Sequence, residues 1–330
     1  MQSVAGQLRI LGQRRPVEAV LQAPEISPAV KLQLQSVPEI LRFASDQLML
    51  PDNGSYRTFV ALEHPFVAWN LFAALEFSLE GLRWCYPVAG CLGYRGYFSA
   101  ATTRAEAARL QASGHDVYVG GVTAYSTLGW FKDPILSSML RADTLDLAAL
   151  LFHELAHQKL WLPDDMELNE AFAEAVARIG IEKLAQTWGD VDLAKFELRA
   201  REEDEFYALV LRHKEKLAAL YASGNPDWRK RALKEEQFAA LRTEYRALNV
   251  NSSTPNRFTV WLETDLNNAK LLAVSAYRKL VPSLLELYHE GGQRLELLYT
   301  LVGQLQGCPL KARHAWVLSG GTLPDCWSQE

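Results

Sequence analysis

The sequence predicts an α+β protein that is mainly helical and carries one small mixed or antiparallel sheet. Over most of the chain, apolar residues recur at the spacing of helices that bury one face. Residues 84–135 differ, because they are rich in Gly, Tyr, Val and Thr, as strands and tight turns are. The chain has 330 residues, 49% of them apolar, and no linker or internal repeat, so we expect a single domain over residues 1–330.

The first part of the chain, residues 1–80, is expected to form a lead-in of short helices. Its apolar residues follow helical spacing up to about Leu79, and prolines interrupt them. The strand-rich region that follows should contain one helix, Thr103 to Ser113. The expected breaks in the lead-in are Pro16, Pro24, Pro28, Pro38 and Pro51.

Helical periodicity returns after residue 135 and lasts nearly to the end. Residues 140–190 should form two apolar helices, and residues 256–330 further C-terminal helices. Residues 191–250 are dense in both signs of charge and are divided midway by ASGNPDW. This pattern is typical of a long antiparallel helical hairpin whose charges face solvent.

Composition excludes some classes of function. The formal net charge is −5 and both signs are evenly mixed, so the sequence lacks a basic stripe for nucleic acid. No apolar run reaches the roughly 20 residues of a spanning helix. The first residues, MQSVAGQLRILGQRRPVEAV, also lack the apolar centre of a secretory signal.

The segment LLFHELAHQK places two histidines and a glutamate within an apolar helix. His153 and His157 are four residues apart, so both imidazoles face one side of a helix and can reach one cation. Glu154 lies about 100° round the helix, where it can contact a metal-bound water. The alternative is a pair of core histidines bonded to carbonyls, with Glu154 paired to a basic group such as Lys159.

A third metal ligand must come from elsewhere, because no third histidine follows at the required spacing. Pro163 ends the first helix, Asp164 or Asp165 can cap the next, and a second helix is expected from Met166 to about Ile179. One face of this helix combines carboxylates with small residues that permit close packing, and its ordinary place would be in solvent. That face holds Glu167, Glu170, Ala173, Glu174 and Ala177.

The four cysteines leave two alternatives open. Cys85 with Cys91, and Cys308 with Cys326, are spaced as two local disulfides, which would fit an oxidising compartment. They could equally be buried free thiols. A C-x-x-C pair is missing, so a cysteine zinc site is not expected.

These motifs resemble a known family. HELAHQ followed by NEAFAEAVARIG resembles the gluzincins, in which a glutamate on the next helix completes the H-E-x-x-H site. Together with CYPVAGCLGYRGYF, DVYVGGVTAYSTLGWFKDP and LNNAKLLAVSAYRKLVP, the chain is similar to the predicted zinc aminopeptidases typical of Proteobacteria. The resemblance covers almost the whole chain and implies a zincin-like catalytic core.

The resemblance also implies a set of site residues. His153, His157 and Glu170 would bind one Zn²⁺ per chain, and Glu154 would be the general base. The gap of 12 residues between His157 and Glu170 is shorter than in the thermolysin-like and large aminopeptidase relatives. This difference leaves Glu167 and Glu174 as fallback ligands.

Export is a further implication of the resemblance. Members of that family commonly start with a lipoprotein-type signal, which implies a periplasmic or cell-envelope location and a lipid anchor upstream of this chain. A disulfide between Cys85 and Cys91 is then favoured. A cytoplasmic location is the alternative.

Three aromatic or histidine residues are candidates for stabilising a tetrahedral oxyanion. Tyr277, on a helix expected from Leu266 to Leu280, is the first candidate, and His289 and Tyr299 are its rivals. For each of them, packing in the core with its polar group bonded to backbone is the ordinary alternative.

Substrate contacts are predicted from the segment GGVTAYSTLGW and the second helix. An extended peptide can pair with a strand edge above the metal, which would bring Tyr125, Ser126 and Thr127 to the substrate. An ordinary core strand is the alternative. Glu174, with Glu167, could hold the ammonium group of a peptide.

The leading functional hypothesis is a zinc-dependent peptidase, with aminopeptidase specificity implied by the family name. It would hydrolyse peptide bonds with a zinc-activated water and Glu154. A non-catalytic, zinc-stabilised binding or scaffold protein of the cell envelope is the alternative, and a metal-free helical protein is a third.

Overall fold

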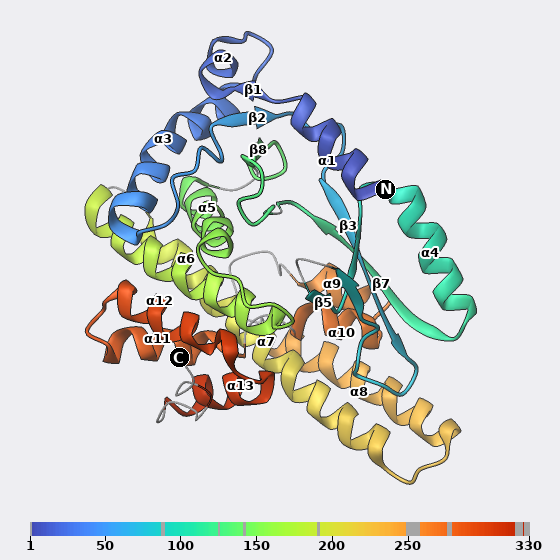
Figure 1. Cartoon of the computed structure of the whole chain (residues 1–330). Coiled ribbons are helices and arrows are strands. Elements are labelled where there is room, and N and C mark those ends of the chain that lie inside the picture. Colours follow the sequence, from blue (N-terminus) through green and yellow to red (C-terminus); the bar gives the residue numbers. More distant parts are fainter. Residues whose placement is uncertain are drawn as a thin grey trace.

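The protein is mainly helical and combines a helical bundle with small sheets (Figure 1). The computed structural model describes residues 2–86, 90–124, 126–140, 143–189, 192–248, 258–275, 279–320 and 326. Within this part of the chain, no helix is long and apolar enough to cross a membrane.

The helices and strands follow one another along the whole chain. The helices are α1 Gln2–Gly12, α2 Val17–Gln22, α3 Pro28–Leu48, α4 Ala100–Ala112, α5 Thr144–Lys159, α6 Met166–Trp188, α7 Leu193–Ala222, α8 Asp227–Leu248, α9 Thr259–Glu263, α10 Asn268–Ser275, α11 Val281–Glu290, α12 Leu295–Gln304 and α13 Leu310–Ser319, with a 3₁₀ turn at Leu305–Gly307. The strands are β1 Arg15–Pro16, β2 Thr58–Val60, β3 Ala68–Leu75, β4 Trp84–Tyr86, β5 Gly90–Leu92, β6 Arg95–Tyr97, β7 His115–Val122 and β8 Ile135–Leu136.

The helical half is organised around α5 and α6, which lie side by side (Figure 1). Together with α3, α11 and α12 they share one large apolar cluster. The two helices approach closely because Gly180 of α6 has no side chain. A Cβ there would lie 2.6 Å from the ring of Phe152 on α5, a distance at which something must move. Four alanines of α6 are also buried: Ala171, Ala173, Ala175 and Ala177.

The sheet half is a three-stranded antiparallel sheet in the order β6-β3-β7. Side chains alternate across the two faces of each strand. Leu71 and Ala73 of β3 pack with Val117 of β7 and with Leu110 of α4, which covers that face. The opposite face turns toward the helical half (Figure 1). One shorter sheet has the order β1-β2-β8, and β4 pairs with β5 in a hairpin.

The prediction of a wholly helical lead-in is wrong after α3. Residues 58–60 and 68–75 form strands β2 and β3, and β3 is the central strand of its sheet. The run AWNLFAAL is apolar on both faces, so periodicity alone cannot distinguish a buried strand from a helix. The predicted break at Pro38 is also wrong, because α3 continues through this residue.

The charged segment forms the predicted helical hairpin. Helix α7 ends at Ala222 and α8 begins at Asp227, so the break falls within ASGNPDW. The inner faces of α7 and α8 share an apolar cluster with α9 and α10 that includes Phe206, Phe238 and Leu271. The hairpin thus has its own apolar core, and α10, which is part of that core, also contacts strands β3 and β7 of the sheet.

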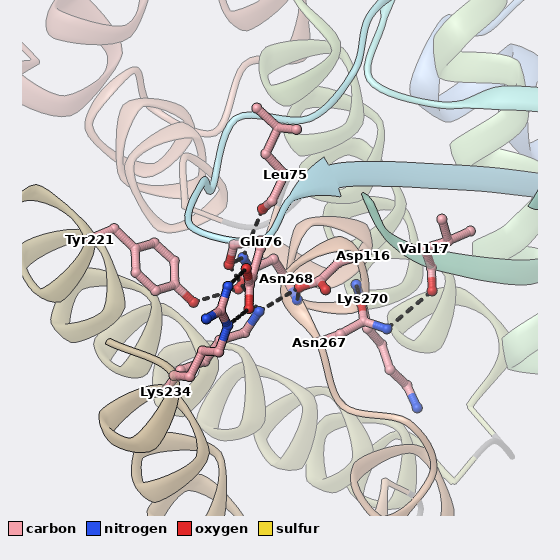
Figure 2. Close-up of polar contacts among 10 residues, drawn as sticks. Leu75, Glu76, Asp116, Val117, Tyr221, Lys234, Asn267, Asn268 and Lys270 are labelled. Atoms are coloured by element: carbon pink, nitrogen blue, oxygen red, sulfur yellow. Dashed lines mark hydrogen bonds and ion pairs between the residues drawn. The ribbon is translucent and has the colours of Figure 1, made fainter. Parts of the chain in front are cut away.

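A polar network fastens α8 and α10 to the end of the β3–β7 pair (Figure 2). The Lys234 ammonium on α8 donates to the Asp116 carboxylate at 2.7 Å and to the Glu76 carbonyl at 3.0 Å. The same carboxylate accepts from the main-chain N–H of Asn268 on α10, and the amide nitrogen of Asn268 donates to the carbonyls of Leu75 and Glu76. Since Lys234 is only 6% exposed, these contacts compensate a buried charge.

We predict that Lys234→Met lowers the free energy of unfolding by about 3 kcal/mol, at the low end of the range for a broken buried ion pair. The matched control is Arg231→Met, which removes the exposed ion pair with Glu76 and should cost clearly less, because solvent screens that pair. Urea unfolding of both variants measures the difference. Equal losses would show that burial does not set the strength of this network.

Candidate metal centre

The histidines of HELAH lie on α5, whose start and end follow from its sequence. The Asp143 carboxylate caps the helix by accepting from the N–H of Asp146 at 3.1 Å. The helix ends at Lys159, before the Pro163 turn. His153 and His157 lie one turn apart, with ring centroids 4.7 Å from each other.

The start of α6 is fixed by two side chains of the connecting turn. Asp165 caps the helix by accepting from the N–H of Leu168, and its carboxylate also lies 2.8 Å from the imidazole of His314 on α13. Asn169 is buried and bonds both main-chain groups of Leu162, each at 2.7 Å. The asparagine of the N-E pair therefore holds the turn, and this places the next residue, Glu170, opposite α5.

The structure brings His153, His157 and Glu170 together. The two Nε2 atoms lie 3.1 Å apart, and the Glu170 carboxylate lies 3.3 Å from Nε2 of His153 and 3.7 Å from Nε2 of His157. One ligand atom of each residue falls within 4.8 Å of the others. Such a set of two imidazole nitrogens and a carboxylate oxygen can hold a divalent metal ion.

Burial and charge act differently on the two imidazoles. Burial lowers the pKa of His157 to about 4, so this ring is neutral, as a metal ligand must be. Burial alone would also lower the pKa of His153, but the hydrogen bond and charge of Glu170 and the nearby charges of Glu154 and Glu174 outweigh it and raise the pKa to about 9. The carboxylates of Glu154, Glu170 and Glu174 therefore favour a positive charge at His153, either on a protonated imidazole or on a metal ion.

Glu154 lies beside the three residues with its carboxylate unpaired among the described residues. The side chain is 7% exposed, and burial, aided by the charges of Glu170 and Asp133, raises its pKa to about 7. A divalent cation nearby would pull this pKa down again. A carboxylate that is buried, unpaired and open to a cavity is suited to accept a proton.

Glu174 faces the back of His153. One of its oxygens lies 4.0 Å from Nδ1 of His153, and the other accepts from Arg178 at 2.8 Å. Arg178 in turn makes a bidentate ion pair with Asp204 on α7, at 2.6 and 2.7 Å. The structure thus places Glu174 behind His153, within ion-pair range of its Nδ1. The contact of Glu174 with substrate stays a prediction.

Two hollows meet at this cluster. One, of about 840 Å³, lies between α5, the inner face of the β6-β3-β7 sheet and helices α9 and α10. The other, of about 650 Å³, is lined by α5, α6 and α7. His153 and Glu154 line both, so the carboxylate of Glu154 is reached from two sides.

The β4–β5 hairpin is docked on the turn between α5 and α6. Cys85 and Cys91 lie opposite each other in the hairpin and are joined by a disulfide. The N–H of Cys91 donates to the Asp164 carboxylate at 2.7 Å. Gly90, with φ +74°, allows this approach, because a Cβ there would lie 2.7 Å from the Asp164 nitrogen. Cys308 and Cys326 are joined as well.

Tyr94 follows this hairpin and reaches the larger hollow, a placement that the sequence reasoning missed. Its ring packs on Phe72 at 5.5 Å, and its hydroxyl makes no hydrogen bond within the described residues. Burial, followed by the charges of Glu170 and Glu154, raises the pKa of Tyr94, so the hydroxyl stays protonated. The residue lies within CYPVAGCLGYRGYF, but only the docking of the hairpin reveals its position.

The other predicted site residues have different outcomes. Tyr277 and Tyr125 lie outside the described residues. Ser126 lines the larger hollow, whereas the hydroxyl and N–H of Thr127 both bond the Asp133 carboxylate. Strand β7 lies at an edge of its sheet and ends at Val122, so the predicted strand GGVTAYSTLGW is wrong beyond GGV, and Ser126 and Thr127 lie outside a strand. Residues 120–124 line the hollow.

The two rivals for oxyanion stabilisation and the first fallback ligand lie away from the cluster. The Tyr299 hydroxyl donates to the Leu48 carbonyl at 2.7 Å inside the helical core. His289 is in the last turn of α11 and does not line the hollow. Glu167 lies 4.0 Å from Nδ1 of His314.

Comparison with known proteins gives one match. The model of the family described as Putative aminopeptidase matches residues 1–317. The chain belongs to this family. Searches of curated proteins and of solved structures found no match. The family match covers both candidate helices and supports a peptidase role.

We predict that Asn169→Ala destabilises the turn that positions Glu170. It leaves two main-chain groups of Leu162 unpaired, at a cost of about 1–3 kcal/mol each. Urea unfolding in the presence of a chelator measures the loss without a contribution from metal. The control is Asn225→Ala, whose amide donates to the Ser223 hydroxyl in the exposed α7–α8 turn and should cost less. A loss no larger than that of the control would contradict the role given to Asn169.

Proposed function

We propose that this protein is a zinc-dependent peptidase in which His153, His157 and Glu170 bind the metal. The observation that carries the proposal is the spacing of the three ligand atoms. Zinc bonds of about 2.0–2.1 Å in a tetrahedron separate neighbouring ligand atoms by roughly 3.3 Å. Here the two Nε2 atoms lie 3.1 Å apart, one Glu170 oxygen lies 3.3 Å from Nε2 of His153, and its other oxygen lies 3.7 Å from Nε2 of His157, all close to that value.

The donor set and its surroundings favour a catalytic over a structural zinc. Structural zinc sites usually have four protein ligands, whereas catalytic sites have three and keep one position open. Within the described residues the cluster has three members, and a large hollow opens beside it. This contrast supports a peptidase over a zinc-stabilised scaffold protein.

The chemistry divides between the metal and the chain. When bound, zinc would acidify a water molecule and polarise the scissile carbonyl. Glu154 would accept the proton of that water and return it to the leaving amine, since its carboxylate is unpaired and faces both hollows. Glu174, fixed by Arg178, would hold the His153 ring in its orientation.

Tyr94 is our candidate for the donor that stabilises the oxyanion. It is protonated, it lines the same hollow as Glu154 and Glu170, and its hydroxyl is unpaired among the described residues. A preformed donor of this kind costs no reorganisation when charge develops on the carbonyl oxygen. This role replaces that predicted for Tyr277, whose position lies outside the described residues.

The edge of β7 is suited to bind an extended peptide. Val117 turns its carbonyl outward, where it accepts from the Asn267 amide at 3.1 Å, so by alternation Val119 and Gly121 also turn their main-chain groups away from β3. A substrate strand can pair with these groups. Aminopeptidase specificity rests on the family description and is tested by comparing free and acetylated N-termini on the same peptides.

The cell envelope is the location that we propose. The structure joins Cys85 to Cys91 and Cys308 to Cys326, and such disulfides persist in oxidising compartments.

We predict that Glu154→Gln lowers kcat by about 10²–10⁴-fold, because it removes the general base but leaves the ligands. Zinc content, measured by elemental analysis, should stay near one per chain. His153→Ala is the matched comparison and should lose both zinc and turnover. Full activity in Glu154→Gln would rule out this mechanism, and a wild-type protein without zinc affinity would rule out the metal site.

Tyr94→Phe should lower kcat by about 10²–10³-fold, with little change in KM, since the lost hydrogen bond forms in the transition state. The measurement is steady-state hydrolysis of a fluorogenic peptide. Tyr86→Phe, at the rim of the same hollow, is the control and should retain activity. An unchanged kcat in Tyr94→Phe would contradict a role of Tyr94 in stabilising the oxyanion and would leave Tyr277 as the candidate.

A further inference from the structure

The larger hollow is built as a receptor for an apolar group. It opens directly from His153, Glu154 and Glu170 and has a volume of about 840 Å³. Ligand sites in proteins have volumes of about 300–1,000 Å³ and mostly apolar linings. The hollow therefore has the size and the position of a substrate site.

The floor of the hollow is the inner face of the β6-β3-β7 sheet, and its centre is made of small residues. Gly96 and Gly120 lie on this face, on either side of Asn70 in the central strand. The opposite face carries Leu71 and Ala73, which pack beneath α4. One face of the sheet is thus filled by a helix. On the other face, the ring of Tyr118 lies over Gly120, where a Cβ would be 3.2 Å from it, and the side chain of Asn70 lies beside Gly96.

Aromatic rings surround this floor. Phe72 and Tyr118 rise from the sheet, with ring centroids 6.2 Å apart. Trp161 follows α5 and packs on His157, and Trp261 comes from α9. Aromatic rings from different elements thus border the space, which favours a flat apolar occupant.

Asn70 places a polar side chain on the floor of the hollow. Its side chain lies on the floor, 3.4 Å from where a Cβ of Gly96 would be, and makes no hydrogen bond with any residue that the structure describes. Ligand sites commonly contain a few polar groups that fix the orientation of the ligand. The unpaired amide is suited to bond the main chain of an occupant.

The second hollow is chemically different. Beside apolar residues, its lining includes the ion-paired groups Asp146, Glu174, Arg178 and Arg199. Since Glu154 faces both hollows, the two sides of the reacting bond meet unlike surroundings. The first hollow differs from the second in the aromatic rings at its border, which favour an aromatic side chain there.

We infer that the larger hollow is the subsite for a bulky apolar side chain, aromatic above all, on the residue next to the cleaved peptide bond, with the Asn70 amide bonding the substrate main chain. This inference rests on the proposed peptidase function. It adds the substrate class, which neither the family description nor the ligand set gives.

The experiment compares peptides that differ only at the residue next to the cleaved bond, with Phe, Ala or Lys placed in turn on either side. For the preferred side, the wild-type protein should show kcat/KM at least about tenfold higher for Phe than for Ala or Lys, as hydrophobic pockets allow. Gly96→Val fills the floor and Ala273→Leu fills the opposite wall, and each should reduce this ratio severalfold. Gly224→Val, in the α7–α8 turn with open space around it, is the matched control and should leave the ratio unchanged.

Binding separates this inference from the proposed function. Calorimetric titration of Glu154→Gln with the Phe peptide should show binding that is severalfold weaker when Gly96→Val, Ala273→Leu or Asn70→Ala is added. Thermal unfolding shows whether each variant folds. If Gly96→Val or Ala273→Leu fails to fold, the result for the other variant is used. Equal kcat/KM for Phe and Ala on both sides, or a ratio unchanged in both filling variants, would overturn the subsite. Absence of cleavage together with this binding pattern would overturn the peptidase function and leave the subsite standing.

Discussion

The close packing of α6 against α5 is the constraint on which the rest of the site depends. Two imidazoles one turn apart on α5 define only one side of a metal site, and the carboxylate of Glu170 must approach them from another helix. Gly180, the buried alanines and the Asn169 contacts with Leu162 allow and fix this approach. The same packing creates a cluster of carboxylates whose charge requires a cation nearby. Stability and chemistry are therefore set by one interface between helices.

Elements far apart in the sequence complete the site around this interface. The disulfide hairpin docks on Asp164 and brings Tyr94 to the hollow, while α13 supports the start of α6 through His314. The network of Lys234, Asp116 and Asn268 holds α10 against the sheet, and α10 forms a wall of the same hollow. The charged hairpin therefore affects the site indirectly, because it holds α10 in place as one wall of the larger hollow.

Local patterns were sufficient to predict most of the helices and the shared face of the two histidines, but they could not predict the surroundings. The spacing of His153 and His157 fixes their shared face by helix geometry alone, and the capping aspartates and Pro163 mark the turn between the helices. The choice of Glu170 over Glu167 and Glu174 depended on a family resemblance, because all three share one face. Strand β3 was missed because AWNLFAAL is apolar on both faces, and Tyr94 was missed because its position depends on contacts distant in sequence.

The account is tested most directly by crystals of the zinc-loaded protein and anomalous diffraction at the zinc edge. It predicts one strong anomalous peak about 2.0–2.3 Å from Nε2 of His153, Nε2 of His157 and a carboxylate oxygen of Glu170. No peak at this point, with the two imidazoles bonded only to each other and to Glu170, would contradict it.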